Sequence, residues 1–303
     1  MKTELLAPAG DIEAGYAALF YGADAVYLGL QQFSARATAT NFSEENLNEF
    51  VGYAHHLGRK VYAAVNTLVQ EKELSDLLKS LDICSRCKVD AVILQDLGVA
   101  RIIRESYPEL EMHASTQMDN RTVQKVKFLA DVGFRQVVLA RELTLDEIAK
   151  IHAACPDTLL EVFVHGALCV SYSGQCYVSQ ACFGRSANRG ECAQFCRLGF
   201  DMVDADGKVI ARNKHLLSLK DMNQSENLEA LLDAGASSLK IEGRLKDVSY
   251  VKNVTAYYRQ KLDAILKRRK EYIRASSGTV KLAFRPQLDK SFSRGFTDYF
   301  VHG

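Results

Sequence analysis

The 303-residue sequence has no apolar run long enough to cross a membrane, and its first residues lack the long apolar core of a secretion signal. We therefore expect a cytoplasmic protein with no membrane partner. The chain also lacks a strong net charge, because 38 basic residues against 37 acidic residues leave only +1. No overall field attracts such a chain to nucleic acid, so any contact of that kind must depend on a local patch.

Eight short apolar runs alternate with longer amphipathic stretches. The runs lie at residues 5–7, 25–28, 61–65, 91–94, 112–115, 136–140, 162–164 and 239–241. Each is followed by helix-like periodicity, which is typical of a βα unit. Eight such units in about 270 residues predict an α/β fold, the (β/α)8 TIM-type barrel. The rival doubly wound sheet is disfavoured, because no Gly-x-Gly-x-x-Gly turn follows the first run.

Two segments fall outside this repeat. The seventh and eighth runs are separated by more residues than one βα unit needs. The surplus predicts an insertion at 168–216, on the active face of a barrel that spans 1–270. A basic helix is expected at 257–274. The remaining residues, 271–303, look strand-like between 279 and 299 and predict a short C-terminal β extension. This extension either packs on the barrel or is the truncated start of a further module.

Five of the eight cysteines lie between residues 169 and 196. Cys169, Cys176, Cys192 and Cys196 are separated by six, fifteen and three residues, with glycines nearby. Four thiolates suit either a zinc ion or an iron–sulfur cluster, and spacing alone does not distinguish these metals. The plainer alternative is a set of buried thiols that only pack. Cys182 is a fifth member of the group that either substitutes for a ligand or packs.

The other cysteines give weaker signals. Cys84 and Cys87 form a C-x-x-C pair, which invites a redox interpretation. The pair comes late in a helical stretch, however, and not at a helix N-terminus that would lower a thiol pKa, so packing is the favoured interpretation. Cys155 precedes a proline in a loop and receives no role.

Polar residues concentrate where the predicted strands end, which is the pattern of a catalytic mouth. Strand alternation places Glu161, Phe163 and His165 on one side of the seventh strand. The candidate catalytic residues are His165, Glu161 and Glu242. The candidate substrate-binding residues are Asn66, His113, Gln117, Arg141, Lys240 and Arg244. The alternative is an internal salt-bridge network in which Lys240 and Arg244 hold Glu242. His165, four residues before Cys169, could touch a metal, orient substrate or hydrogen-bond in the core.

Several motifs resemble peptidase family U32 in order along the chain. They are Leu5–Gly10, Gly22–Gly29, His113–Gln117, Glu161–Ser179 and Lys240–Arg244. Within that family, Phe33–Arg36 and Gly184–Gly190 are most similar to the branch that hydroxylates a cytidine of 23S ribosomal RNA. Sister branches hydroxylate a tRNA wobble uridine or act in ubiquinone synthesis.

The resemblance implies a barrel that carries a 4Fe–4S cluster on Cys169, Cys176, Cys192 and Cys196. It also implies prephenate as the source of the hydroxyl group, and the Arg and Lys side chains at the mouth could hold such a dicarboxylate. Members of the rRNA branch continue beyond this chain, and Arg294–Thr297 resembles the opening of their next module. RNA contact would then rest on the basic stretch 259–274, whose alternative interpretation is an ordinary solvated helix face.

Three hypotheses follow. The first is an iron–sulfur hydroxylase acting on a base of 23S rRNA or tRNA. The second is a collagenase-like peptidase, zinc-dependent or metal-independent, that uses His165 and Glu161. It is weakened if Cys169 is a cluster ligand, because that thiolate could not then serve as a nucleophile. The third is a non-catalytic scaffold in which the cysteines bind structural zinc.

Overall fold

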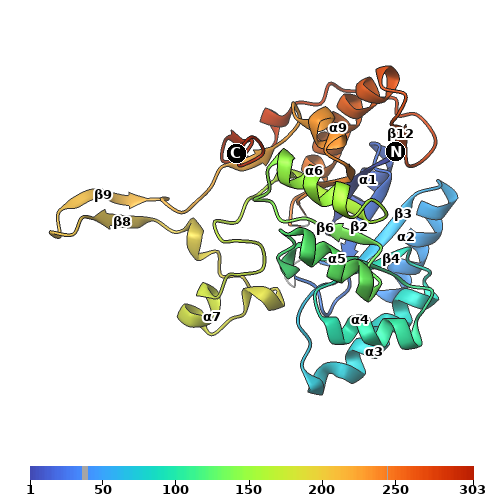
Figure 1. Cartoon of the computed structure of the whole chain (residues 1–303), viewed down its shortest axis with the longest axis horizontal. Coiled ribbons are helices and arrows are strands. Elements are labelled where there is room, and N and C mark those ends of the chain that lie inside the picture. Colours follow the sequence, from blue (N-terminus) through green and yellow to red (C-terminus); the bar gives the residue numbers. More distant parts are fainter. Residues whose placement is uncertain (36–39, 244) are drawn as a thin grey trace.

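The computed structural model describes residues 1–35, 40–243 and 245–303. Eight parallel strands pair in sequence order, and the last pairs with both the first and the seventh, which closes the barrel. They are β1 (Lys2–Ala9), β2 (Ala25–Gly29), β3 (Lys60–Val65), β4 (Ala91–Leu94), β5 (Glu111–Ala114), β6 (Gln136–Val138), β7 (Leu159–Gly166) and β11 (Ala236–Ile241). Every predicted apolar run is one of these strands, so the (β/α)8 prediction is confirmed (Figure 1).

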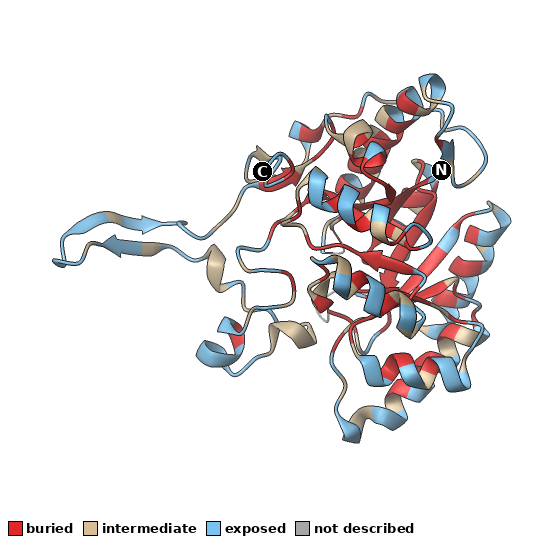
Figure 2. Cartoon of the chain, in the orientation of Figure 1, coloured by how far each residue is buried: buried red, intermediate tan, exposed pale blue. Residues whose placement is uncertain are grey.

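Helices surround the barrel because each places an apolar stripe against the strands. They are α1 (Ile12–Phe20), α2 (Glu44–His56), α3 (Leu74–Arg86), α4 (Leu97–Ser106), α5 (Val123–Val132), α6 (Leu145–Ala154), α8 (Leu228–Asp233) and α9 (Val248–Arg268). Side-chain N-caps fix several starts: Ser43 begins α2, Thr144 begins α6 and Asp247 begins α9. Figure 2 shows buried strands inside helices whose outer faces are exposed.

The segment predicted as an insertion leaves the barrel after β7. It contains α7 (Val178–Phe183), the 3₁₀ turns η3 (Ala187–Arg189) and η4 (Phe195–Arg197), and a hairpin of β8 (Phe200–Val203) and β9 (Val209–Lys214). The hairpin projects away from the barrel and is almost wholly exposed (Figures 1 and 2). The chain then returns through β10 (Asp221–Asn223), which pairs antiparallel with the end of β7.

The C-terminal part differs from the prediction in detail. Helix α9 begins nine residues before the expected basic helix and ends at Arg268, with β12 (Ile273–Arg274) pairing parallel to β1. Of the stretch expected to be strand-like, only β13 (Phe296–Thr297) is a strand, and it extends β10. The 3₁₀ turn η5 (Leu288–Lys290) and irregular backbone make up much of the rest. The segment therefore packs on the barrel through two short strands at its opposite ends.

Within the described parts of the chain, no helix is both long and apolar enough to cross a membrane. Arg36 and Arg244, which the sequence singles out, lie outside the described residues.

Candidate functional site

The cysteine-bearing segment lies across the C-terminal ends of the barrel strands, held by contacts to three strand-end loops. The Ser173 amide donates to Glu142 Oε1 at 3.0 Å, after β6. Gly174 has φ +76° and packs so tightly on the turn η2 (Thr116–Met118) that a Cβ would lie 2.0 Å from the Gln117 carbonyl oxygen. Arg189 forms an ion pair with Glu73, near the loop after β3. This segment therefore covers the mouth of the barrel.

Asn66 and Gln117, both predicted to bind substrate, lie together at the mouth. Gln117 Nε2 donates to the Asn66 carbonyl at 3.0 Å, and Asn66 Nδ2 lies 3.4 Å from Ser115 Oγ. Asn66 Oδ1 also accepts from the Ala35 amide at 3.0 Å. The ends of β3 and β5 thus present a hydrogen-bonded amide cluster next to Gly174 at the mouth of the barrel.

Arg141 and Glu242 form the charged part of the mouth. Arg141 Nη2 lies 2.9 Å from Glu242 Oε2, with side chains 12% and 13% exposed. The guanidinium also stacks on the Phe163 ring, 3.9 Å from its centroid. Glu242 is therefore paired with Arg141. The salt-bridge interpretation had predicted Lys240 as a partner of Glu242, but Lys240 pairs with Glu161. Such a half-buried, preoriented guanidinium suits a carboxylate ligand.

Glu161 and Lys240 lie inside the barrel and pair with each other. Lys240 Nζ is 2.6 Å from Glu161 Oε1, and Gln136 Nε2 donates to Glu161 Oε2 at 2.6 Å. Glu161 is 0% exposed. Both carboxylate oxygens of Glu161 thus have a protein partner, which is what a buried ion pair requires.

His113 also lies in the interior, away from the predicted contact with substrate. It is 0% exposed, stands edge-on to the Tyr62 ring, and places Nε2 3.0 Å from Glu111 Oε1 at the start of β5. Tyr62 in turn donates to Glu4 at 2.6 Å, and burial raises the pKa of Glu4. His113 thus belongs to a polar network directed toward the N-terminal ends of the strands, opposite the mouth.

The predicted orientation of His165 is wrong. The register of β7 against β11 skips one residue, since Lys240 pairs with Phe163 but Ile241 pairs with His165. This bulge reverses the alternation of side chains. His165 Nδ1 therefore lies 3.3 Å from the Tyr258 hydroxyl on α9, and the His165 ring also contacts Tyr250 and Phe296. Burial lowers the pKa of His165 to about 3, so the imidazole is neutral at physiological pH.

The four cysteines predicted to bind metal are free thiols on the segment over the mouth. Burial is the main cause that raises the pKa of Cys169; a backbone hydrogen bond from Ser171 and the charge of Arg141 lower it, and Cys176 and Cys196 add smaller contributions that raise it. Among the described residues, however, no three His, Cys, Asp or Glu side chains are arranged as metal ligands. The donor chemistry fits a metal centre, whereas the described positions of the thiols do not form one.

The remaining cysteines differ in their surroundings. Cys84 and Cys87 are buried at the end of α3, and burial raises the pKa of Cys84 to about 12 and that of Cys87 in the same direction. This burial disfavours the thiolate and supports the packing interpretation. Cys155 is buried as well, whereas Cys182 is exposed in α7.

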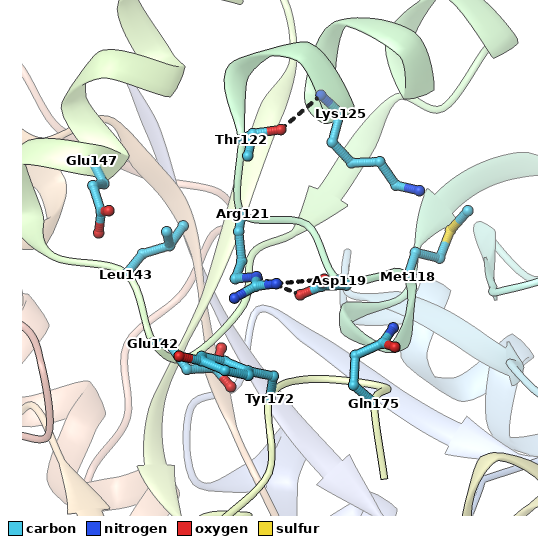
Figure 3. A pocket seen from close by; sticks show the side chains of 10 residues that line it. All are labelled: Met118, Asp119, Arg121, Thr122, Lys125, Glu142, Leu143, Glu147, Tyr172 and Gln175. Carbon is cyan, nitrogen blue, oxygen red and sulfur yellow. Dashed lines mark hydrogen bonds and ion pairs between the residues drawn. The ribbon is translucent and has the colours of Figure 1, made fainter. Parts of the chain in front are cut away.

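A cavity of about 640 Å³ adjoins the mouth between η2, α5, the loop after β6 and the inserted segment. Figure 3 shows Arg121 beside Asp119 and above the Tyr172 ring. The Arg121 guanidinium lies 2.6 Å from Asp119 Oδ1 and 4.4 Å from the centroid of Tyr172. None of these residues was predicted from the sequence. The only available signal was their place beside predicted strand ends and the first cysteine.

The fold and the mouth define a (β/α)8-barrel protein with a thiol-rich segment over a polar site. The sequence profile of peptidase family U32 matches residues 10–303. The chain belongs to this family, as its motifs predict.

Two relatives and one solved structure show the range of the family. The 23S rRNA 5-hydroxycytidine C2501 synthase of Escherichia coli (strain K12) is 52% identical over 301 residues, 99% of this chain but 45% of that protein. The tRNA hydroxylation protein P1 of Bacillus subtilis (strain 168) is 33% identical, over 100% of this chain and 71% of its own length. The U32 peptidase Mk0906 matches with a TM-score of 0.51 at 14% identity, over 80% of this chain and 94% of that chain, which supports the fold.

Proposed function

We propose that this chain carries the active site of an RNA base hydroxylase, which replaces a ring C–H of a pyrimidine in 23S rRNA or tRNA with C–OH. The observation that carries the proposal is the thiol-bearing segment fixed over a polar mouth by Ser173, Gly174 and Arg189. The similarity to an rRNA synthase and a tRNA hydroxylation protein supports the substrate class. Because the chain spans less than half of the first relative, that relative's activity is carried over here only as a proposal.

Cys169, Cys176, Cys192 and Cys196 are the residues that would hold a 4Fe–4S cluster, with zinc as the alternative metal. The support is chemical, since four free thiols occur on one short segment over the mouth. Binding would require the segment 169–196 to draw its thiols closer together. Such a cluster would supply single electrons or activate the hydroxyl donor.

The residues of the mouth then take distinct roles. Arg141 offers a guanidinium, stacked on Phe163, to a carboxylate of a small dicarboxylate co-substrate, which we propose to be prephenate. Glu242 holds that guanidinium in place until the ligand arrives. The amides of Asn66 and Gln117 lie at the neighbouring strand ends and could orient the base by hydrogen bonds.

Metal content after strictly anaerobic purification tests the cofactor. We expect about four iron and four sulfide per chain, lost in Cys176→Ser and retained in Cys155→Ser, because Cys155 lies outside the segment. One equivalent of zinc without iron, even after attempted anaerobic cluster reconstitution, would instead support the zinc scaffold.

The reaction is tested by mass spectrometry of 23S rRNA and tRNA from a strain that lacks the gene. A hydroxylated pyrimidine that disappears, returns with the wild-type gene and does not return with Cys176→Ser is the expected result. Unchanged modification in the deletion strain would refute the proposal.

The peptidase hypothesis receives no support from the geometry of its two predicted residues. His165 contacts α9 outside the barrel, whereas Glu161 forms an ion pair with Lys240 and accepts a hydrogen bond from Gln136 inside it. Hydrolysis of denatured collagen by homogeneous protein, abolished by a His165→Ala variant that remains folded, would be needed to restore that hypothesis.

A further inference from the structure

A second cavity, of about 360 Å³, lies between the N-terminal turns of α9 and the irregular C-terminal segment that packs on them. Four of its lining residues are basic: Lys246, Lys252, Arg285 and Lys290. Among its described lining residues only Asp247 is acidic, and its carboxylate already caps α9 by accepting from the Tyr250 amide at 2.8 Å. The cavity therefore has an excess of positive charge.

None of these four cations forms an ion pair with a carboxylate among residues 1–35, 40–243 and 245–303. The contrast with the rest of α9 is sharp. Lys261 pairs with Glu226 at 2.7 Å, and Arg269 pairs with Glu229 at 2.6 Å. Burial lowers the pKa of Lys246, although the carboxylates of Asp221 and Asp247 act on it in the opposite direction. An anion from outside the chain would supply the negative charge that these four cations lack.

Aromatic rings alternate with these cations. Lys246 Nζ lies 5.1 Å from the ring centroid of Tyr250 and 4.8 Å from that of Phe292. Lys252 Nζ lies 4.7 Å from the centroid of Phe284. The Phe292 side chain is also 68% exposed, although a ring of this size is usually buried. Of these rings only Phe292 is exposed, whereas Tyr250 is buried and Phe284 is partly buried. An exposed ring beside several cations is an arrangement by which proteins hold a single strand of nucleic acid.

The cavity also lies at the correct end of the barrel. Its residue Tyr250 donates a hydrogen bond from its hydroxyl to the Glu242 carbonyl at 2.9 Å, directly behind the mouth. The basic stretch 259–274 does not share this position. Arg259 and Arg274 bind Asp24, which precedes β2 at the opposite end of the barrel. Among the basic residues of 259–274, Arg259 is buried, and Lys261, Arg268 and Arg269 pair with carboxylates of the chain, whereas Lys267 and Lys270 are exposed.

We propose that this cavity binds single-stranded RNA next to the nucleotide held in the mouth. Phosphodiester groups contact Lys246, Lys252, Arg285 and Lys290, and one flanking base stacks on Phe292. The site recognises the backbone and a ring face without reading a particular sequence. This inference rests on the proposed function, because it assigns the surface that holds that function's substrate.

The test is the binding of a fluorescently labelled single-stranded RNA of about 12 nucleotides, followed by anisotropy. The variant Lys252→Gln/Arg285→Gln/Lys290→Gln removes three charges from the cavity. Its control, Lys150→Gln/Lys267→Gln/Lys270→Gln, removes three exposed charges elsewhere that form no ion pair within the described chain. We expect the cavity variant to weaken binding at least about tenfold and to reduce the salt dependence, while the control changes the dissociation constant less than about threefold.

A second variant isolates the aromatic contact. Phe292→Leu keeps an apolar side chain at an exposed position and should therefore preserve the fold, but it removes the stacking face. We expect RNA binding to weaken by roughly fivefold or more. Binding of polyglutamate, a polyanion without bases that could stack on the ring, should stay unchanged. Equal losses in the cavity variant and its control, or RNA binding unaffected by both cavity variants, would overturn the site.

These results are independent of the hydroxylation assay. Loss of RNA binding in the cavity variants, in a protein that modifies no RNA, would retain the binding site and reject the proposed reaction. Hydroxylation that proceeds normally in the cavity variants would reject the binding site and retain the reaction.

Discussion

Lys240 Nζ lies 2.6 Å from Glu161 Oε1 inside the barrel, where the two side chains are 5% and 0% exposed. The pair links β11 to β7, the two strands whose contact closes the barrel. Two residues predicted to act on substrate thus neutralise each other. An ion pair at this depth matters chiefly through the cost of separating it, because each charge alone would lack solvation.

We therefore expect Glu161→Gln to reduce the free energy of unfolding by about 3 kcal/mol or more, because it leaves the Lys240 charge buried without a partner. Lys240→Met should cost a similar amount. The double variant Glu161→Gln/Lys240→Met should lose less than the sum of the two, as urea unfolding would measure. Additive losses would show that the two residues act independently.

Helix α9 offers a matched comparison of two arginines. Arg259 is 2% exposed, binds Asp24 at 3.0 Å and packs on Gly22, whereas Arg268 pairs with Glu229 and is 57% exposed. We expect Arg259→Met to lower the free energy of unfolding by about 2 kcal/mol or more, and Arg268→Met to lower it clearly less because its ion pair is exposed to solvent. Similar losses in thermal or urea unfolding would contradict the assignment of Arg259 to an internal network.

His165 gives the chain a specific sensitivity to acid. Burial lowers the pKa of His165 to about 3, whereas the unfolded imidazole titrates near 6.5. Between these values the unfolded chain binds a proton that the folded chain does not, so stability falls as the pH is lowered. Going from about pH 7.5 to about pH 5 should cost about 2 kcal/mol through this residue.

Urea unfolding of wild type and His165→Gln at both pH values measures this contribution. The variant should lose less stability than the wild type over the same interval, because its side chain does not titrate. Identical pH dependence of the two proteins would mean that His165 is protonated as easily in the folded state as in the unfolded chain.

Substituting Gly174 and Gly184 by alanine distinguishes a steric clash of the new Cβ from strain in the backbone. Both have positive φ, +76° and +65°, but a Cβ would meet the Gln117 backbone only at Gly174, since nothing lies within 4 Å at Gly184. We expect Gly174→Ala to detach the inserted segment from the mouth and to speed its cleavage in limited proteolysis. Gly184→Ala should cost about 1 kcal/mol of local strain without that effect. Equal cleavage rates would refute the anchoring role of Gly174.

The inserted segment was recognisable from the sequence because it interrupts a regular repeat. The same repeat located all eight barrel strands, since each buried strand of this fold is a short apolar run between amphipathic helices. The family motifs are likewise local, and the profile match over 10–303 confirms the family that they predict.

The orientation of individual side chains was less predictable. Alternation correctly placed Lys240 inside the barrel but failed at His165, because a bulge of one residue turns that side chain toward α9. Arg141 and Glu242 are 101 positions apart in the sequence, so no local pattern could pair them. The predicted basic helix illustrates the same limit, since its arginines find carboxylates from distant elements.

The sequence by itself determined the number of barrel strands, the place of the insertion and its content of cysteines, because periodicity and residue type are local properties of the chain. Only the tertiary structure decided which charges neutralise each other and which remain available. Glu161 and Lys240 are paired in the interior, whereas Lys246, Lys252, Arg285 and Lys290 line an open cavity without carboxylate partners in the described chain. That distinction depends on distance and burial in three dimensions, since the free energy of a charge is set by the groups around it.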